Sequence, residues 1–369
     1  MINGLCADTR ESTHATEIFI AAVPRLGQPI EAEARRIFMA IHDELTARSA
    51  CLFQERIFAT ETVMGQLRDV RAQCYGQIED GVPPSYLVCT PSRLGDFAGV
   101  QVHAISGPRT EVVCDSDGRP HGRRVRAAAS HYLGLSAISA PQAGSAEQQA
   151  RAMFEQAQRI LSSHGASFQA VPRTWLWLRD INGWYSGFNR VRNTFFSECG
   201  ILGRTISPPM PASTGIGLNL SGGADCGMDL TAVLEPPHTI EYHQAGGKQR
   251  SAFEYGSAFS RASRAVTPAG RTVFISGTAS IDRRGQTIYV GDASRQIETT
   301  LDNVLAVLAD MKCRAEDVVQ ALAYSKTLEV EALFETAKVR LDWPWISMIC
   351  DVCRPDLLFE IEVTAMPRR

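Results

Sequence analysis

The sequence lacks the features that mark nucleic-acid-binding, membrane or secreted proteins. Its 369 residues include 37 Lys and Arg against 40 Asp and Glu, so there is no basic excess to attract nucleic acid. No apolar run approaches the roughly 20 residues needed to span a bilayer, and no basic region precedes an apolar core at the N-terminus. We therefore expect a globular cytoplasmic protein that binds neither nucleic acid nor membrane.

The ten cysteines are not arranged as a disulfide framework or a zinc site. They lie at irregular spacings, mostly inside apolar stretches, as expected of reduced thiols used as small core residues. Cys350 and Cys353 form one C-x-x-C, but a structural zinc site normally needs a second ligand pair at similar spacing, and none follows. We predict no metal site.

A common order of elements repeats along the chain. In the C-terminal third, the apolar pattern predicts elements at 271–276 (a strand ending at Gly277), 293–311 (a helix with Asp292 as N-cap), 318–324 (strand), 329–341 (helix), 345–350 (strand) and 357–366 (strand). The same β-α-β-α-β-β order fits residues 18–105. It fits residues 125–234 less well, because the strands around Gly222 and Gly223 are weaker. One long strand at 125–138 opens this unit.

These repeats predict an α/β (α+β) fold made of three units of roughly 120 residues each. The units cover residues 1–115, 120–240 and 245–369. Segments rich in Pro and Gly at 107–120 and 235–247 are predicted to be the linkers between them.

The last predicted strand carries ionisable side chains in an otherwise apolar stretch, with Cys353 and Arg354 just before it and Glu360 and Glu362 within it. A carboxyl group between apolar neighbours loses hydration, which raises its pKa and keeps it protonated near neutral pH, as a general acid requires. A nearby arginine suits an anionic substrate. The alternative is that both glutamates lie on the solvated face of an edge strand, because residues two apart share a face.

The matching strand of the first unit lacks these carboxylates. The apolar pattern of residues 98–105 aligns with that of 359–366, which places Gly99 at the position of Glu360 and Gln101 at that of Glu362. If the units are duplicates, the first has kept a scaffold without the acid, and the chemistry should lie in the third.

The segment at 184–196, which overlaps the helix predicted at 185–199, combines aromatic and polar side chains on one face. Tyr185, Asn189 and Arg192 recur at steps of three and four residues and therefore share this face. Burying an unpartnered guanidinium is costly. Arg192 is therefore expected either to pair with an internal acid or to face an anionic ligand.

Further segments contain hydroxyls, glycine and arginine. Residues 211–217, Pro-Ala-Ser-Thr-Gly-Ile-Gly, allow backbone N–H groups to approach an anion, or form a plain turn before a strand. Residues 255–262 place Arg261 beside an aromatic ring. With residues 276–280 this segment suggests a pocket rim, and the alternative is an exposed arginine and a tight turn.

Together these residues resemble the chorismatases, enzymes related to the RidA/YjgF fold that split chorismate into pyruvate and a ring acid. The matching segments are WYSGFNRVRNTFF, PASTGIG, SAFSRA, FISGTAS and CRPDLLFEIEV, within residues 173–363. The resemblance implies tandem RidA/YjgF-like (chorismate mutase-like) units. Three units in one chain could then form the arrangement that single-unit relatives form as trimers, with the site between the middle and third units. The protein itself is expected to be a monomer or a homotrimer.

The resemblance also implies a role for each matching residue. Glu360 would be the general acid that protonates the enolpyruvyl methylene, and Cys353 precedes it by seven residues, as in the branch that makes 3-hydroxybenzoate. The other implied residues hold or position the substrate, and they are Tyr185, Arg192, Thr214, Gly215, Phe259, Arg261, Gly277 and Arg354. No metal or organic cofactor is needed.

The activity expected from this resemblance is cleavage of chorismate to 3-hydroxybenzoate and pyruvate. One alternative is hydrolysis of chorismate to 3,4-dihydroxycyclohexa-1,5-dienoate and pyruvate. Two others are a RidA-like imine or enamine deaminase, which would release ammonia, and a binding module that holds its ligand without turnover.

Overall fold

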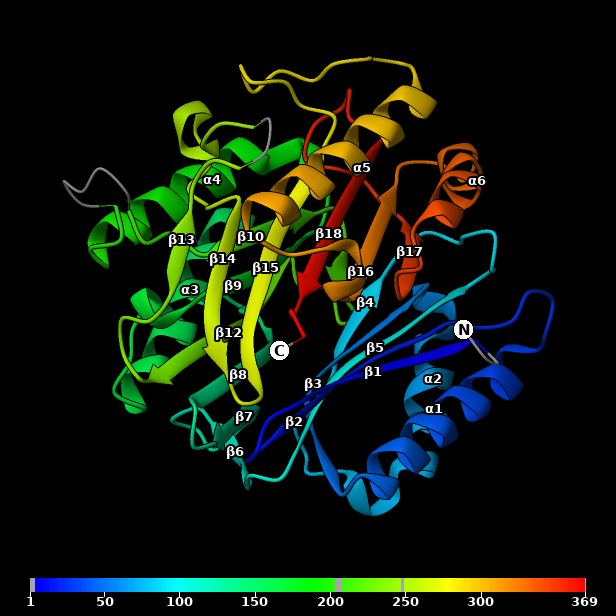
Figure 1. The fold of residues 1–369 in the computed structure, drawn as a ribbon, viewed down its shortest axis with the longest axis vertical. Helices are drawn as coiled ribbons and strands as arrows, with labels where there is room; N and C mark the ends of the chain where they lie inside the picture. Colours follow the sequence, from blue (N-terminus) through cyan, green and yellow to red (C-terminus); the bar gives the residue numbers. More distant parts are fainter. Residues whose placement is uncertain (1–3, 203–207, 247–248, 369) are drawn as a thin grey trace.

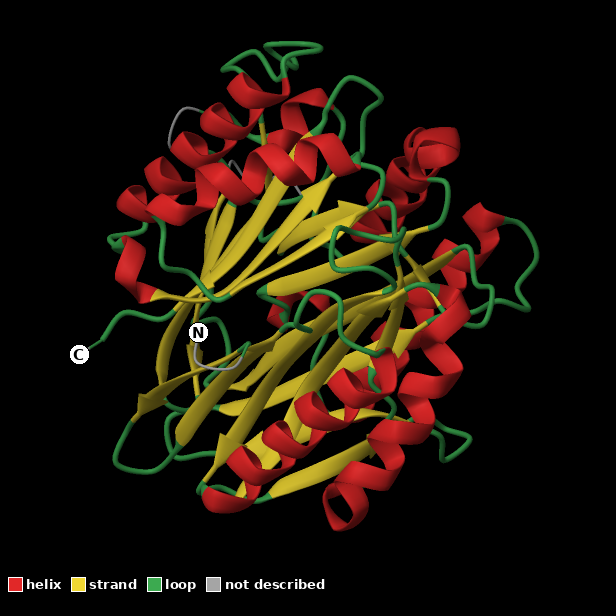
Figure 2. Ribbon diagram, turned by 90° about the vertical axis from the view of Figure 1, so that its right-hand side faces the viewer, coloured by secondary structure: helices red, strands yellow, loops and turns green. Residues whose placement is uncertain are grey.

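The computed structural model describes residues 4–202, 208–246 and 249–368, so the predicted linker at 235–247 ends outside the described residues. The described chain forms three six-stranded sheets, each accompanied by two long helices. The sheets lie at the centre of the molecule and the helices lie on the outside (Figures 1 and 2). This confirms the predicted α/β class and its repeated architecture. No helix in the described part of the chain is both long and apolar enough to cross a membrane.

In all three sheets the order of the strands differs from their order along the chain. From one edge to the other, the first sheet contains β1 (Leu5–Glu11), β2 (Thr16–Ala22), β5 (Phe97–Ser106), β3 (Ala50–Ala59), β4 (Ser85–Val88) and β11 (Asn219–Leu220), with α1 (Ile30–Ala47) and α2 (Glu61–Tyr75). The second contains β10 (Ala212–Ile216), β9 (Arg173–Leu178), β12 (Cys226–Glu235), β8 (His131–Ile138), β7 (Pro120–Arg126) and β6 (Thr110–Cys114), with α3 (Ala146–Ser163) and α4 (Ile181–Glu198). The third contains β13 (Glu241–His243), β14 (Ala262–Thr267), β15 (Gly270–Ala279), β18 (Phe359–Ala365), β16 (Val318–Ser325) and β17 (Trp345–Ile349), with α5 (Ala293–Asp310) and α6 (Leu328–Ala337).

The helices form where an apolar stripe recurs at helical spacing. In α1 the buried stripe consists of Ala34, Ile37, Phe38, Ile41 and Leu45. The predicted N-cap of α5 is confirmed, because the Asp292 side chain accepts a hydrogen bond from the Arg295 backbone N–H. At the start of α3, Ser145 and Gln148 form a capping box. Each helix pair therefore covers the outer face of a sheet with its own apolar core.

The inner faces of the sheets meet around both apolar and charged side chains. One apolar cluster contains Phe53, Trp175 and Phe274, from the first, second and third sheets. Two buried ion pairs join the sheets: Arg56 Nε lies 2.7 Å from Asp229 Oδ2, and Arg173 Nη2 lies 2.7 Å from Glu362 Oε2. The three sheets therefore share one core as well as having their own.

The structure corrects three sequence predictions. First, each unit has one more strand at its start than predicted. In the first and third units, β1 and β14 precede the first predicted strand. In the second unit, the predicted strand at 125–138 is the hairpin β7–β8, which turns between Ala127 and Ser130. The predicted linkers contain two strands, β6 and β13, which extend their sheets. The predicted strand end at Gly277 is instead a bulge, because β15 continues to Ala279 with a register shift between Ile275 and Thr278.

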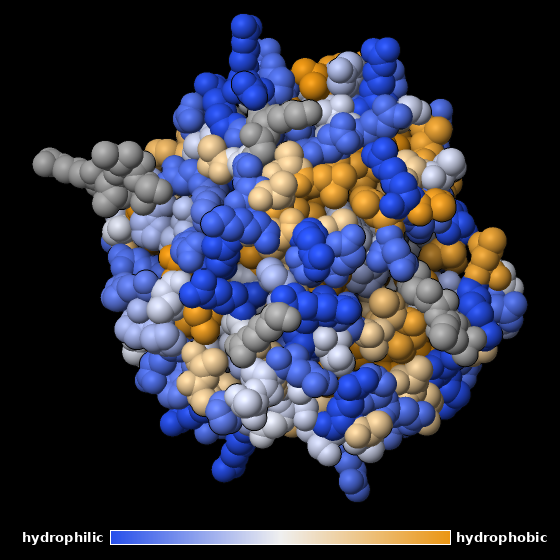
Figure 3. Space-filling model, viewed as in Figure 1, coloured by the Kyte–Doolittle hydropathy of each residue, from blue (hydrophilic) through white to orange (hydrophobic). Residues whose placement is uncertain are grey.

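Hydrophilic side chains cover much of the face seen in Figure 3, with apolar residues gathered between them. Among the described residues, no group of three or more His, Cys, Asp or Glu side chains is placed to hold a metal ion. All ten cysteines are free thiols.

Candidate functional site

A narrow cavity lies between the second and third sheets, and it is lined by nine of the ten residues predicted for the site. The wall consists of Tyr185, Arg192, Ser213, Gly215, Ser257, Phe259, Arg261, Gly277, Ala279, Ile281, Cys353, Arg354 and Glu360. Its volume is about 40 Å³, a few times the roughly 10–15 Å³ that a cavity needs to hold a single water. A larger ligand therefore requires the wall side chains to move apart.

Glu360 lies on a central strand, with β18 hydrogen-bonded to β15 on one side and β16 on the other. Only 4% of Glu360 and 4% of Glu362 is exposed, so the alternative of a solvated edge strand is wrong. Burial, followed by the negative charge of Glu362, raises the pKa of Glu360 to about 8, although Arg261 opposes this shift. Glu360 is therefore mostly protonated at neutral pH and can donate a proton.

Glu362 is held by two donors from β9 of the second sheet. Its carboxylate accepts hydrogen bonds from Arg173 Nη2 at 2.7 Å and from Trp175 Nε1 at 2.8 Å. Arg173 is itself buried, at 2% exposure, and its Nη2 also donates to Thr214 Oγ1 at 2.6 Å. This pairing keeps a negative charge two residues from Glu360 on the same face of β18.

Arg192 enters the cavity from α4 and has no carboxylate partner within the described residues. Its Nη2 donates to Asn189 Oδ1 at 2.6 Å, it hydrogen-bonds the Tyr185 hydroxyl, and its guanidinium lies 5.5 Å from the Phe188 ring centre. Burial lowers the pKa of Arg192 and raises that of Tyr185. Of the two expectations for Arg192, the geometry favours an anionic ligand over an internal acid.

Arg261 is buried at 2% exposure, so the alternative of an exposed arginine is wrong. Its guanidinium lies 5.2 Å from the centre of the Phe259 ring, and its Nε donates to the Arg250 carbonyl at 3.3 Å. Burial lowers its pKa to about 10, against the opposing effect of Glu360. Arg192 and Arg261 thus place two buried cations on one small cavity, which favours a ligand with negative charge.

Cys353 and Arg354 form the part of the wall just before β18, and both are partly exposed. Burial, followed by the charge of Glu360, raises the pKa of the Cys353 thiol to about 12, so the thiol stays protonated at neutral pH. Arg354 Nη1 donates to the Gly285 carbonyl at 2.8 Å. Cys353 is therefore placed to shape the cavity and is not activated as a nucleophile.

Thr214 is the one predicted residue that is not on the cavity wall. Residues 211–217 are not the predicted turn, because they contain the edge strand β10, which runs parallel to β9. The Thr214 hydroxyl accepts hydrogen bonds from Arg173 and from the Gly277 backbone N–H at 3.0 Å. Thr214 therefore stabilises the β15 bulge at Gly277 through this hydrogen bond and does not line the cavity.

Gly277 is required at the bulge because of Glu360. A Cβ at this position would lie 1.9 Å from Glu360 Oε1 and 3.1 Å from Thr214 Cγ2. Any side chain here would displace the acid. Gly215 is less crowded, since its nearest contact would be the Tyr185 ring at 3.5 Å.

In the first and second sheets, the positions equivalent to Glu360 carry glycine, and neighbouring residues leave no space for an acidic side chain. Gly227 lies on β12, the strand that matches β18 in the second sheet, and a Cβ there would lie 2.3 Å from the Leu220 side chain. A Cβ on Gly99 in β5 would lie 2.7 Å from the Ala22 carbonyl and 3.3 Å from the Ile346 side chain. The glycines that replace Glu360 are thus packed against neighbouring residues.

Sequence reasoning missed Ile281 on the wall, and it missed Arg173 and Trp175 behind it. Ile281 directly follows the predicted pocket rim at 276–280 but carries no chemical signal of its own. Arg173 did carry a signal, because it is the first residue of an apolar strand, and a cation buried there needs an acidic partner. That partner, Glu362, lies 189 residues later in the sequence.

Comparisons with known proteins give matches of three kinds. The family model described as endoribonuclease L-PSP matches residues 257–366. A 3-hydroxybenzoate synthase of Streptomyces hygroscopicus is 27% identical over 259 residues, which cover 61% of this chain and 72% of that protein. The crystal structure of a chorismatase superposes with a TM-score of 0.64 at 19% identity, covering 97% of this chain and 99% of the other.

The structural match spans nearly the whole chain, including the first sheet, where sequence motifs gave no guidance. The sequence match and the family model independently agree with it. This chain therefore has the fold of the chorismatase structure, and its sequence is similar to that of the 3-hydroxybenzoate synthase.

Proposed function

We propose that this protein cleaves the enolpyruvyl ether of chorismate to pyruvate and 3-hydroxybenzoate. The observation that carries the proposal is Glu360, a buried carboxyl group with a pKa of about 8, beside Arg261 in a cavity between two sheets. A vinyl ether is cleaved by proton transfer to carbon, which needs a desolvated acid. The name of the relative in Streptomyces hygroscopicus agrees with this product.

In the proposed reaction the Glu360 O–H bond breaks and its proton forms a C–H bond with the enolpyruvyl methylene. The electron pair of the C=C bond makes the new C–H bond, which leaves an oxocarbenium centre at the ether carbon beside the Glu360 carboxylate. The ring hydroxyl oxygen then attacks the neighbouring ring carbon, whose ether C–O bond breaks and leaves its electron pair on the departing pyruvate. The hydroxyl proton returns to the Glu360 carboxylate, and the resulting epoxide opens with a shift of ring hydrogen to give 3-hydroxybenzoate. Formation of 3-hydroxybenzoate consumes no water, because the atoms of chorismate equal those of the two products.

The two buried arginines of the cavity account for substrate charge. Chorismate is a dianion, and Arg192 on α4 and Arg261 just before β14 both line the cavity. Each can hold one carboxylate by charge-assisted hydrogen bonds, with Arg354 at the more exposed side. The cavity is narrower than chorismate, so binding requires the wall around Tyr185 and Arg354 to open.

Purified protein incubated with chorismate should release pyruvate and 3-hydroxybenzoate in equal amounts. Pyruvate is followed with a coupled assay, and the ring product is identified by chromatography. A non-aromatic diol in place of 3-hydroxybenzoate would assign the hydrolytic reaction, which consumes one water. Absence of pyruvate would contradict the proposal, and ammonia release from imine substrates would then favour the deaminase.

Replacing Cys353 with alanine should shift the ring product from 3-hydroxybenzoate towards the diol while pyruvate release continues. The smaller side chain leaves space in the wall beside Glu360, and a water that enters it can attack the oxocarbenium centre. The product ratio is measured by chromatography at complete conversion.

Cys350→Ala is the matched control, since Cys350 is buried and precedes Cys353 by three residues but does not line the cavity. It should leave the product ratio unchanged. An unchanged ratio in Cys353→Ala as well would remove the thiol from the choice of product.

A further inference from the structure

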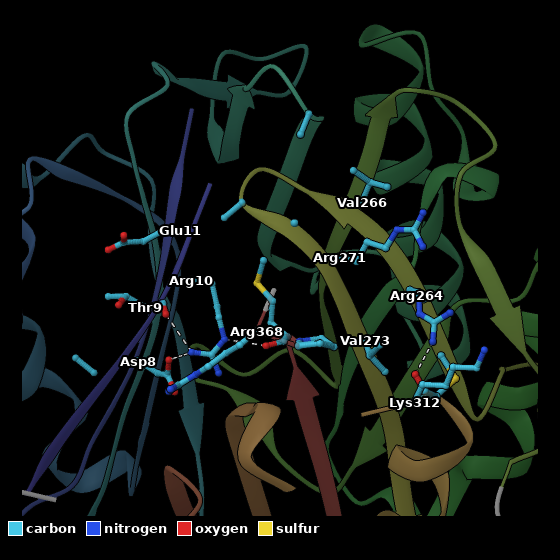
Figure 4. Close-up of a pocket in the computed structure, with 17 residues that line it drawn as sticks. Asp8, Thr9, Arg10, Glu11, Arg264, Val266, Arg271, Val273, Lys312 and Arg368 are labelled. Carbon is cyan, nitrogen blue, oxygen red and sulfur yellow. Dashed lines mark hydrogen bonds and ion pairs between the residues drawn. The ribbon is translucent and has the colours of Figure 1, made fainter. Parts of the chain in front are cut away.

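A second, wider groove lies between β1 of the first sheet and the β14–β15 hairpin of the third, and it ends at residues that follow β18 (Figure 4). We call it the β1–β14 groove. Its volume is about 1080 Å³, and none of the residues that line it also lines the cavity around Glu360. Its surroundings must therefore be explained separately from the proposed reaction.

Five cationic side chains line the β1–β14 groove: Arg10, Arg264, Arg271, Lys312 and Arg368. Arg10 and Arg368 lie near β1 and β18, while the other three lie across the groove (Figure 4). The chain as a whole has a net charge of −3, so this concentration of positive charge is local.

The carboxylates near the groove neutralise only part of this charge. Asp8 pairs with Arg10, and Glu241 pairs with Arg264 at 2.8 Å. The Glu11 carboxylate points away from the cluster (Figure 4). The remaining three cations, Arg271, Lys312 and Arg368, are exposed and have no ion-pair partner within the described residues.

Arg10 is the buried member of the cluster, with 4% of its surface exposed. Its Nε donates to the Met366 carbonyl at 2.8 Å and its Nη1 to the Thr9 carbonyl at 3.0 Å, whereas Nη2 has no hydrogen-bond partner among the described residues. Burial and the neighbouring charge of Arg368 lower the pKa of Arg10, against the opposing effect of Asp317. A buried donor without a partner destabilises the folded protein, and an adjacent like charge adds repulsion.

We propose that the β1–β14 groove binds a small molecule that carries phosphate or carboxylate groups. One oxyanion would lie beside Arg10 and Arg368, where it supplies the missing acceptor and separates the two positive charges. Arg271 and Lys312 would face a second anionic group across the groove. The planar guanidinium fork matches both oxyanions, and the volume suits a metabolite larger than a single ion.

The test measures binding of inorganic pyrophosphate and of citrate to the full-length protein by calorimetry at constant ionic strength. Constant ionic strength separates specific binding from general screening. Saturable binding of at least one anion is expected, with pyrophosphate tighter for a phosphate site and citrate tighter for a carboxylate site. Arg368→Gln and Arg271→Gln should each weaken binding by roughly three- to tenfold, as the loss of one exposed charge contact predicts.

Arg159→Gln is the matched control, since Arg159 is an exposed arginine on α3 without an ion pair among the described residues. It should bind as the wild type does. No saturable binding of either anion, or an equal loss in Arg159→Gln, would overturn the proposal. So would binding that disappears in Arg192→Met but survives in Arg368→Gln, because the anion would then lie in the cavity around Glu360.

Discussion

Glu360→Gln is expected to lower chorismate turnover by about 10²–10⁴-fold, the range that proton transfer by a positioned acid supplies. Glutamine has nearly the same size and fits the space above Gly277, but it has no acidic proton for the enolpyruvyl methylene. Pyruvate release measures the loss. Circular dichroism and thermal unfolding should report a folded protein.

Glu331→Gln provides the matched control for this variant. Glu331 is also buried, at 1% exposure, and its pKa is also raised by burial, but it accepts a hydrogen bond from the Arg93 backbone N–H outside the cavity. Its removal should leave turnover unchanged. Wild-type turnover by Glu360→Gln would refute the assignment of the acid.

The pKa of Glu360 also predicts how activity and stability respond to pH. Turnover should fall as pH rises through about 8, because the acid loses its proton. Its folded-state pKa of about 8 lies above the ordinary value of 4.5, so the folded protein binds this proton more tightly than the unfolded chain. This contribution to stability is present below pH 4.5 and is lost as pH rises to 8. As pH rises from 4.5 to 8, the unfolding temperature of the wild type should therefore fall relative to that of the Glu360→Gln variant.

Replacing Arg173 with methionine should lower the free energy of unfolding by about 3–5 kcal/mol, the cost of leaving a buried carboxylate without its partner. Glu362 is 4% exposed and would keep only the Trp175 indole as a donor. Thr214 would lose a hydrogen bond as well. Denaturant unfolding at pH 7 measures the change.

The double variant Arg173→Met/Glu362→Gln should recover much of the lost stability, since no uncompensated charge remains. Arg35→Met tests an exposed pair instead, because Arg35 lies 3.7 Å from Glu31 with more than half of each side chain exposed. It should change stability by no more than about 1 kcal/mol. A similarly small loss in Arg173→Met would mean that Glu362 does not depend on this ion pair.

Local sequence pattern predicted the helices and the central strands well, because each is apolar at a regular spacing. It missed β1 and β14, whose sequences LCADTRE and ASRAVT alternate weakly. These strands form because a neighbouring strand offers unpaired backbone groups, which no short window reveals. Ala127 to Ser130 contains no glycine, proline or asparagine, so the turn that divides β7 from β8 gave no signal either.

The position of Glu360 in a buried strand could be read from its apolar neighbours, but its surroundings could not. The pattern allowed a solvated face because Glu360 and Glu362 alternate with apolar residues, as they would on an edge strand. What buries them is another unit of the chain, which brings Arg173 and Trp175 against the inner face of β18. Such contacts depend on how the sheets assemble, which local periodicity does not encode.

The cavity around Glu360 takes one wall from the second sheet and the other from the third, and both belong to the same polypeptide. No encounter between separate molecules is needed to bring these walls together. The specific activity of the protein should therefore be independent of its concentration, even at dilutions where assemblies of separate subunits would dissociate. At Gly99 and Gly227, neighbouring residues fill the space that an acidic side chain would need. Each chain should therefore also have a single catalytic centre and show no cooperativity.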